Sequence, residues 1–246
     1  MAVLRKHGQE ANTLVIFMGD NGMAFPHGKG SLYDPGLNVP LIARWPGHVK
    51  PGTTRTLISG EDLAATFMHA GGATPPKAVS GRSLYPLLTG GSYQPREYVF
   101  GARLHHGNAS FGPLTKADTF DLSRCVRSNR WKLIYNVTPE MEYWPINSGQ
   151  GPGWQQIVAA HKAGTLKPEH ERAYFQRPRP VLELYDVEAD AGELTNLAGK
   201  AEYKDIEQTL MAAMQEKIIT DYDYVPPVLN ESNQANRKAA AAAKKE

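Results

Sequence analysis

Residues 12–47, NTLVIFMGDNGMAFPHGKGSLYDPGLNVPLIARWPG, decide the fold of this chain. The stretch begins with an apolar run, residues 13–18, that is rich in β-branched and aromatic side chains and is bounded by polar ones. Such a run is typical of a strand that is buried on both faces of a parallel sheet. A second apolar run, residues 39–44, predicts another short buried strand, which Trp45-Pro46-Gly47 ends.

The first run ends in Gly19-Asp20-Asn21-Gly22. In open α/β sheets, ligands bind beyond the carboxyl ends of the strands, so Asp20 and Asn21 lie where a functional site is expected. Their oxygens suit a hard cation such as calcium or magnesium. Lys29, in the following glycine-rich loop, would hold an anionic substrate beside that cation. The plainer interpretation is a turn, in which Asx side chains bond their own backbone, followed by a solvated lysine.

The order of these residues resembles the sulfatase family of the alkaline-phosphatase-like superfamily. In that family a hydrophobic strand ends in Asp-Asn-Gly, a Gly-Lys or Gly-Arg follows, and a segment with Leu-Tyr, Val-Pro-Leu-Ile and Trp-Pro-Gly comes next. The residues that match are Asp20, Asn21, Lys29, Leu32, Tyr33, Gly36, Val39, Pro40, Leu41, Ile42, Trp45, Pro46 and Gly47. The resemblance implies that Asp20 and Asn21 bind Ca²⁺, and that Lys29 is a catalytic residue that contacts the substrate sulfate.

The resemblance also implies parts that these 246 residues lack. The family's nucleophile is a formylglycine in a Cys-x-Pro-Ser-Arg-like motif, and an Asp-Asp pair completes its calcium site. Neither is in the chain, and Cys125 lies outside any such motif. Residues 2–11, followed by the first strand, resemble a passage from the middle of the family's domain. We therefore expect the C-terminal part of a sulfatase, inactive alone, whose partner is the missing N-terminal half of the catalytic domain.

The expected fold class is α/β. Residues 1–94 are expected to form the C-terminal portion of an alkaline-phosphatase-like α/β sandwich domain. Residues 95–226 are expected to form a smaller α+β subdomain with an antiparallel sheet and a C-terminal helix. Gly90-Gly91 and Pro95 mark the boundary between them. Residues 227–246 are polar and then rich in alanine and lysine, which predicts a disordered tail.

Apolar spacing and turn residues place the individual elements. Helices are expected at residues 2–11, 61–70, 84–88 and 202–219, and further strands at residues 57–59, 98–102, 124–128, 131–135 and 183–186. A long insertion, residues 148–180, precedes the last of these strands. Asp62 is interpreted as a structural residue at a helix start, with metal binding as the alternative. Cys125 is interpreted as a small buried hydrophobic residue.

Two local features resemble the heparan N-sulfatase (sulfamidase) branch of the family. They are Phe25-Pro26 ahead of Lys29, and Val99-Phe100-Gly101 followed by His105-His106. In that branch an arginine commonly stands where this chain has Lys29. His105 and His106 either line a sugar pocket as substrate-binding residues or are structural, and the same alternatives hold for His27. Trp144 and Trp154 form either an aromatic wall for sugar or a packed edge.

The resemblance implies hydrolysis of sulfuric esters or sulfamates on sulfated glycans, such as those with heparan-type N-sulfoglucosamine. The alternatives are a phosphoesterase of the same superfamily and a non-catalytic remnant that binds sulfated carbohydrate. A net charge of +2 gives no case for nucleic acid, and no apolar run is long enough to span a membrane. The first residues do not form a secretion signal, although full-length relatives are periplasmic, secreted or lysosomal. The location of this chain and a homodimer are left open.

Overall fold

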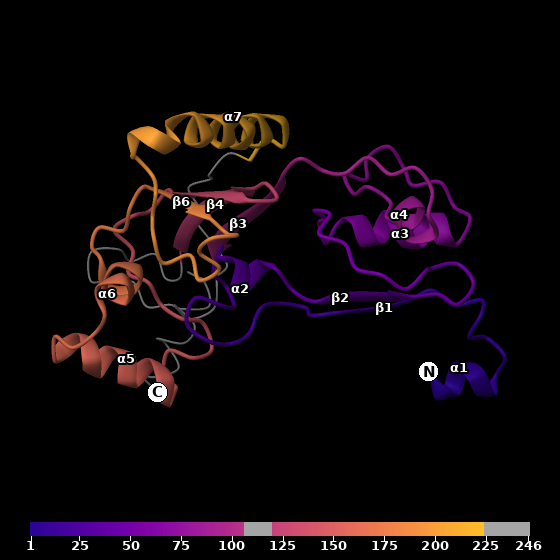
Figure 1. The fold of residues 1–246 in the computed structure, drawn as a ribbon, viewed down its shortest axis with the longest axis horizontal. Coiled ribbons are helices and arrows are strands. Elements are labelled where there is room, and N and C mark those ends of the chain that lie inside the picture. The colour runs from indigo at the N-terminus through magenta and orange to yellow at the C-terminus, as the bar shows by residue number, and fades with distance from the viewer. Residues whose placement is uncertain (106–119, 224–246) are drawn as a thin grey trace, which may run out of the picture. The chain divides into compact units, whose positions relative to one another are not determined.

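The computed structural model describes residues 1–105 and 120–223 (Figure 1). The chain divides into two compact units, Met1–Met214 and Gln215–Glu246. Every strand and every candidate site residue that is described below belongs to the first unit. The predicted disordered tail falls within residues 224–246, outside the described residues, and the predicted boundary near residue 94 stays a prediction.

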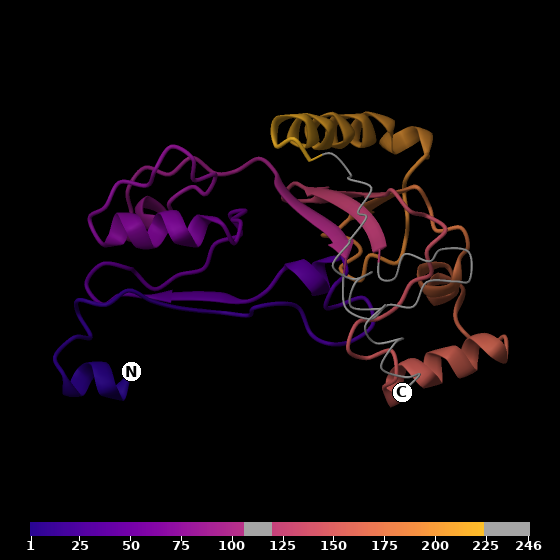
Figure 2. The same ribbon diagram turned by 180° about the vertical axis from the view of Figure 1, so that it is seen from behind.

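Four antiparallel strands form the larger sheet (Figure 2). They are β3 (Val99–His105), β4 (Phe120–Arg127), β5 (Trp131–Asn136) and β6 (Leu182–Asp186), and they lie in the order β3-β4-β5-β6. All three pairings are antiparallel. The predicted antiparallel sheet is therefore confirmed.

Apolar side chains at matching positions hold this sheet together. Leu133 in β5 lies opposite both Val126 in β4 and Leu184 in β6, and all three are completely buried. Cross-strand pairs of this kind are the main side-chain stabilisation of a sheet. Cys125 is also buried, and burial raises the pKa of its thiol to about 11. Its interpretation as a small hydrophobic residue is confirmed.

The strands of the opening stretch are arranged differently from the prediction. Among the described residues, β1 (Val15–Met18) pairs with β2 (Leu41–Arg44) alone, and the pairing is antiparallel. Phe17 and Ile42 lie opposite each other, and 65% and 61% of their surfaces are exposed. The prediction of a parallel strand buried on both faces is therefore wrong for this chain. An apolar run indicates that its side chains favour burial, but it does not specify which strand pairs with it.

Four short helices occupy the first 90 residues: α1 (Ala2–Lys6), α2 (Asp34–Leu37), α3 (Asp62–Ala70) and α4 (Tyr85–Thr89). The helices expected at residues 61–70 and 84–88 are confirmed as α3 and α4. α1 is shorter than expected, because Gly8 takes the left-handed conformation with φ 66°. The strand expected at residues 57–59 is absent, and residues 53–59 form irregular backbone.

Asp62 is structural, as predicted. Its buried carboxylate accepts hydrogen bonds from the backbone N–H groups of Ser59 at 2.8 Å and Arg82 at 2.6 Å, and it forms an ion pair with Arg96. Burial acts to raise the pKa of Asp62, but the hydrogen bonds from Arg96, Ser59 and Arg82 together with the charge of Arg96 outweigh it and keep the carboxylate ionised. These donors occupy the carboxylate oxygens of Asp62, which would have to bind a metal in the alternative interpretation.

Two helices fill the insertion ahead of β6. α5 (Pro152–Lys162) and α6 (Pro168–Phe175) each begin with a proline, which is favoured in the first turn because it has no N–H to leave unpaired. α7 (Lys204–Thr220) follows a short 3₁₀ turn, Ala201–Tyr203, and confirms the last predicted helix. None of the described helices combines the length and apolar character needed to cross a bilayer.

Candidate functional site

The loop between β1 and α2 is so tightly folded that some of its glycines have no room for a side chain. A Cβ on Gly22 would lie 2.1 Å from the carbonyl oxygen of Pro35, and a Cβ on Gly28 would lie 2.2 Å from that of Met23. The backbone N–H of Lys29 donates to the same Met23 carbonyl at 2.8 Å. These backbone contacts give the loop one compact form and fix the point at which the Lys29 side chain leaves it.

Asp20 and Asn21 follow β1 directly, and both are exposed. Within the described part of the chain, neither side chain makes a hydrogen bond or ion pair. The local side-chain-to-backbone bonds that would explain an Asx turn are therefore missing. The carboxylate and carboxamide oxygens of these two residues are available to a ligand.

These two oxygen donors fit calcium in kind but are too few to hold it alone. Calcium takes about six to eight oxygen ligands. Among residues 1–105 and 120–223, no group of three or more His, Cys, Asp or Glu side chains could hold a metal ion. Asp20 and Asn21 can therefore supply only part of a calcium site, and its other ligands would come from outside the described residues.

Lys29 is partly buried on the same loop. Its ammonium group forms no ion pair with any of the described carboxylates. A lysine that is held by its backbone and has no internal counterion is available to bind an external anion as a point charge. The structure thus places the three predicted site residues on one loop and leaves their polar groups free.

His27 belongs to this loop, and its side chain is buried. Its ring stacks on Tyr33 with the ring centroids 3.6 Å apart, and its backbone N–H donates to the hydroxyl of Tyr143. Burial lowers the pKa of the imidazole to about 4, although a backbone hydrogen bond with Glu193 acts against this shift. The ring is therefore neutral near pH 7, and the structural alternative for His27 is the one that the packing supports.

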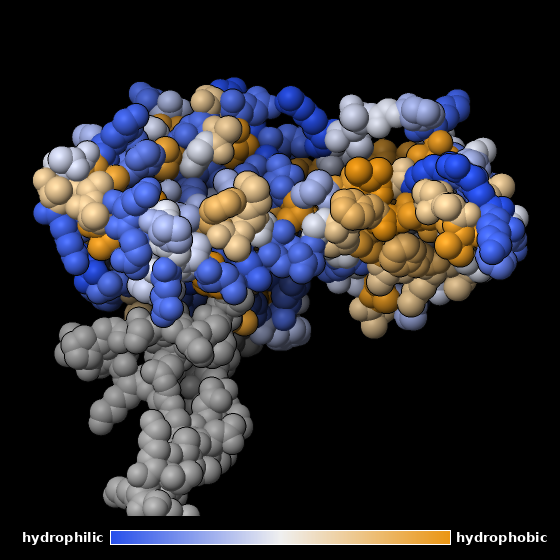
Figure 3. All heavy atoms as spheres, turned by 90° about the horizontal axis from the view of Figure 1, so that it is seen from below, coloured by the Kyte–Doolittle hydropathy of each residue, from blue (hydrophilic) through white to orange (hydrophobic). Residues whose placement is uncertain are grey.

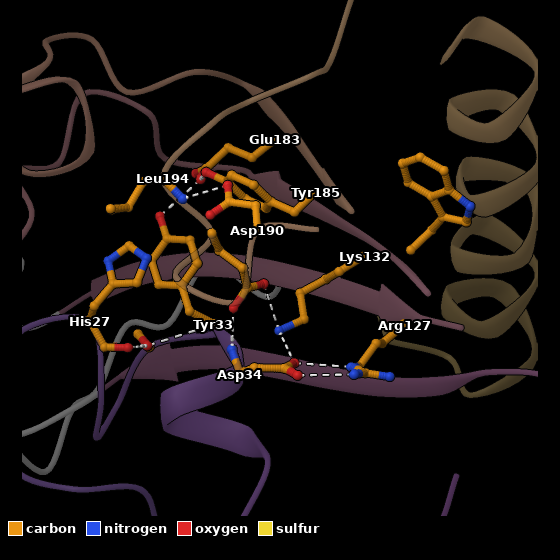
Figure 4. A network of polar contacts seen from close by, with 12 residues as sticks. His27, Tyr33, Asp34, Arg127, Lys132, Glu183, Tyr185, Asp190 and Leu194 are labelled. Carbon is orange, nitrogen blue, oxygen red and sulfur yellow. Dashed lines mark hydrogen bonds and ion pairs between the residues drawn. The ribbon is translucent and has the colours of Figure 1, made fainter. Parts of the chain in front are cut away.

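A buried cluster of charges fixes the end of the loop to the sheet (Figure 4). Asp34, the first residue of α2, accepts two hydrogen bonds from Arg127 at 3.0 and 2.9 Å. The ammonium of Lys132 lies 2.5 Å from Asp34 and 2.8 Å from Glu193, and Lys132 and Glu193 are completely buried. Burial acts to raise the pKa of Asp34, but Arg127 and Lys132 outweigh it, so the carboxylate stays ionised.

A second buried carboxylate holds the aromatic ring beside His27. Glu183 accepts hydrogen bonds from the hydroxyls of Tyr33 at 2.8 Å and Tyr185 at 2.5 Å, and from the side-chain amide of Asn136 at 2.5 Å. Burial raises the pKa of both tyrosine hydroxyls well above the usual range, so both remain donors. Tyr33 is therefore fixed at both ends, and the loop above it is held in place.

The sequence did not reveal the roles of Asp34, Lys132 and Glu193. One signal was present, because Lys132 interrupts an otherwise apolar strand and a lysine is almost never fully buried unless it is paired. Nothing in the sequence indicated that its two partners would be Asp34 and Glu193, which lie far from it along the chain.

The remaining predicted residues have mixed outcomes. His106 lies outside the described residues, and His105 ends β3 with its side chain also outside them, so their sugar-binding role stays a prediction. Trp154 is buried against Tyr143, which supports the packed-edge alternative for this residue. Trp144 is partly exposed and lies against Gly149, where a Cβ would come within 2.4 Å of the indole.

Comparisons with known proteins agree with the motif. The family model described as Sulfatase matches residues 1–73. An ulvan-active sulfatase from Formosa agariphila is 32% identical over 204 residues, which are 82% of this chain and 36% of that protein. Human N-sulphoglucosamine sulphohydrolase is 30% identical over 210 residues, covering 79% of this chain and 39% of that protein. The chain thus spans less than half the length of these relatives.

Solved structures show the same fold. The structure of BT4656 in complex with its substrate D-glucosamine-2-N,6-O-disulfate matches with a TM-score of 0.62 and 22% identity, covering 93% of this chain and 38% of that chain. A phosphonate monoester hydrolase from Silicibacter pomeroyi matches with a TM-score of 0.60 and 24% identity, covering 91% of this chain and 38% of that chain. At these identities the matches establish the alkaline-phosphatase-like fold and not the reaction.

Proposed function

Because this chain belongs to the sulfatase family, we propose that it supplies the metal-binding and sulfate-binding loop of a sulfuric ester or sulfamate hydrolase. Asp20 and Asn21 would hold calcium, and Lys29 would bind the sulfate group. One observation carries the proposal: the three residues stand in the family's order on a rigid loop, and their side chains have no internal partner in the described part.

Calcium, when bound, would neutralise the negative charge that develops as the sulfate group is transferred. In that reaction this chain would position the calcium ion and bind the sulfate group. Asp20 and Asn21 offer oxygen ligands at the end of β1, and the packed glycines and the Lys29 N–H bond to Met23 hold the backbone from which Lys29 extends. Lys29 would hold the sulfate as a point charge, where an arginine would bind it through two parallel hydrogen bonds.

The proposed substrate is a sulfated glycan, such as one containing heparan-type N-sulfoglucosamine. Relatives that support this class are N-sulphoglucosamine sulphohydrolase and an N-acetylglucosamine-6-O-sulfatase from Bacteroides thetaiotaomicron, which is 26% identical over 218 residues. His105 and His106 would contact the sugar. Sulfate release from N-sulfated and from O-sulfated sugars distinguishes which of the two groups is removed.

The proposed partner is the rest of the catalytic domain, which would carry the formylglycine nucleophile. Two observations support it. The chain spans 36% of the length of the ulvan-active sulfatase. In addition, apolar side chains gather on the surface over the part of the chain that holds β1 and β2 (Figure 3), and Phe17 and Ile42 are among the exposed ones. A soluble surface rarely leaves such a patch uncovered. Without that partner we expect the chain to be inactive.

The first test is to sequence the coding DNA on the 5′ side of the Met1 codon. If an in-frame segment encodes an Asp-Asp pair and a Cys-x-Pro-Ser-Arg-like motif, the whole product is expressed with a formylglycine-generating enzyme. Sulfate release is then measured from N-sulfoglucosamine and from 6-O-sulfated glucosamine. We expect release that depends on calcium, and none from residues 1–246 alone.

The same assay separates the alternatives. A phosphoesterase of the superfamily, suggested by the fold shared with the phosphonate monoester hydrolase, would release phosphate or phosphonate and leave the sulfate esters intact. A non-catalytic remnant would bind sulfated sugar without calcium and would turn over neither substrate. Either result would contradict the proposed sulfatase activity.

A further inference from the structure

A small polar cavity lies beside the sheet, and none of Asp20, Asn21 and Lys29 lines it. Its volume is about 20 Å³. The polar side chains around it include Ser31, Tyr33, Arg103, Asn136, Tyr143 and Arg179. A polar cavity of this size has room for about one water molecule or one small polar group.

Two arginines beside this cavity share one carboxylate. Arg103 and Arg179 both pair with the same carboxylate, Asp121: Arg103 at 3.3 Å, and Arg179 at 2.5 Å. The two arginine side chains are only 10% and 13% exposed. Two nearly buried guanidinium groups therefore share one directly paired carboxylate. A second carboxylate, Glu183, lies behind the lining residues Tyr33 and Asn136 and is occupied by the hydrogen bonds that they and Tyr185 donate.

The hydrogen-bond donors around the cavity also outnumber the acceptors. The Nε–H groups of Arg103 and Arg179 are buried and have no acceptor in the described part of the chain. The hydroxyl oxygen of Tyr143 accepts the backbone N–H of His27, which leaves its own hydrogen free to donate. Burial raises the pKa of Tyr143, so this hydrogen stays in place. Buried donors without acceptors are costly unless a ligand or water satisfies them.

We propose that this cavity binds an oxyanion group of a small ligand, a carboxylate, sulfate or phosphate, between Arg103 and Arg179. The anion would lie between the two guanidinium groups and accept from donors that the described residues leave unpaired. The cavity volume admits one carboxylate or the outer oxygens of a sulfate or phosphate, and the rest of the ligand would remain outside. The site is independent of the proposed sulfatase reaction, since none of Asp20, Asn21 and Lys29 lines the cavity.

The test is isothermal titration calorimetry of the full chain with sodium acetate, sulfate and phosphate, at constant ionic strength set with chloride. We expect saturable binding of at least one oxyanion, and the three titrations identify which chemistry is preferred. Arg103→Lys and Arg179→Lys keep the charge opposite Asp121 but remove the Nε–H donor and the planar fork. Each is expected to weaken binding by about tenfold or more.

Two matched controls locate the anion. Arg130→Lys changes an exposed arginine that pairs with Asp186, and it should leave binding unchanged. Lys50→Gln should also leave it unchanged, because Lys50 is exposed and does not line the cavity. If an arginine variant fails to fold, Tyr143→Phe serves as the test instead. It keeps both arginines and should also weaken binding. The proposal is overturned by an absence of saturable binding, or by binding that none of these cavity variants weakens.

Discussion

The ammonium of Lys132 lies 2.5 Å from the carboxylate of Asp34, and the lysine side chain has no exposure to solvent. Lys132 stands in β5, while Asp34 begins the helix that follows the Lys29 loop. The pair therefore ties the loop to the sheet. Its position predicts that changes at Lys132, distant along the sequence from Lys29, will affect the candidate site.

Replacing Lys132 with methionine should destabilise the fold strongly. The change leaves Asp34 with Arg127 alone and leaves the buried carboxylate of Glu193 without a cation. Breaking a buried pair by removing one partner costs about 3–5 kcal/mol. Urea unfolding followed by circular dichroism measures the loss. Arg130→Met is the control: it removes an arginine whose side chain is 55% exposed, and we expect the unfolding midpoint to change little. Equal midpoints for the two variants would refute the role of the cluster.

His27 should make the stability of the chain depend on pH. Its pKa is about 4 in the folded chain and about 6.5 when unfolded. Between these values the unfolded chain binds a proton that the folded chain does not. Stability should therefore be complete above about pH 6.5 and fall as the pH decreases toward 4, by up to about 3 kcal/mol.

Thermal unfolding between pH 8 and 4.5 measures this dependence. The upper end lies where the imidazole is neutral in both states, and the lower end stays above the lowered pKa of Asp34. His27→Asn suits the left-handed backbone at this position, where φ is 67°, and should flatten the pH profile. His7→Asn changes an exposed histidine and should leave the slope as it is. A slope that His27→Asn does not reduce would assign the effect to other groups.

Strands and helices with strong local patterns could be predicted from the sequence. The hairpin of β4 and β5 has apolar runs on both sides of a Ser128-Asn129 turn, and it formed as expected. α3 followed from its helical spacing. The helices of the insertion were missed, although Pro152 and Pro168 mark their first turns. These proline signals are short and are equally compatible with loops.

Long-range relationships could not be predicted. The apolar run that forms β1 indicated burial but gave neither the antiparallel partner nor the exposure of Phe17. Similarly, a lysine in a strand does not identify the carboxylates that will surround Lys132. Asp20, Asn21 and Lys29 could be proposed as one site because they are close together in the sequence, whereas Arg103 and Arg179 meet only through the fold.

Lys29 should respond to substitution according to charge and geometry. In the complete, formylglycine-containing protein, Lys29→Arg should retain most sulfate-releasing activity, because an arginine also binds sulfate and stands at this position in the sulfamidase branch. Lys29→Gln should lower kcat/KM by about 10²–10³, the loss typical of removing one group that stabilises charge in the transition state. Steady-state assays on the sulfated sugar measure both variants. Lys50→Gln, at an exposed lysine, is the control, and equal losses for Lys29→Arg and Lys29→Gln would contradict a role based on charge.

The exposed pair Phe17 and Ile42 should make residues 1–246 associate when they are produced alone. The two side chains lie opposite each other on neighbouring strands and are 65% and 61% exposed, so they present apolar surface that the rest of a catalytic domain is proposed to cover. Phe17→Ser with Ile42→Thr removes most of this surface and keeps residues that a strand accepts. Sedimentation velocity should show concentration-dependent association of the unaltered chain and a mostly monomeric double variant.

Val3→Ser with Ile219→Thr, at two other exposed apolar residues, is the control and should associate like the unaltered chain. In the complete protein the Phe17 and Ile42 changes should instead lower the unfolding temperature, since there the face is covered. Association that persists in the double variant would show that another surface of the chain drives it.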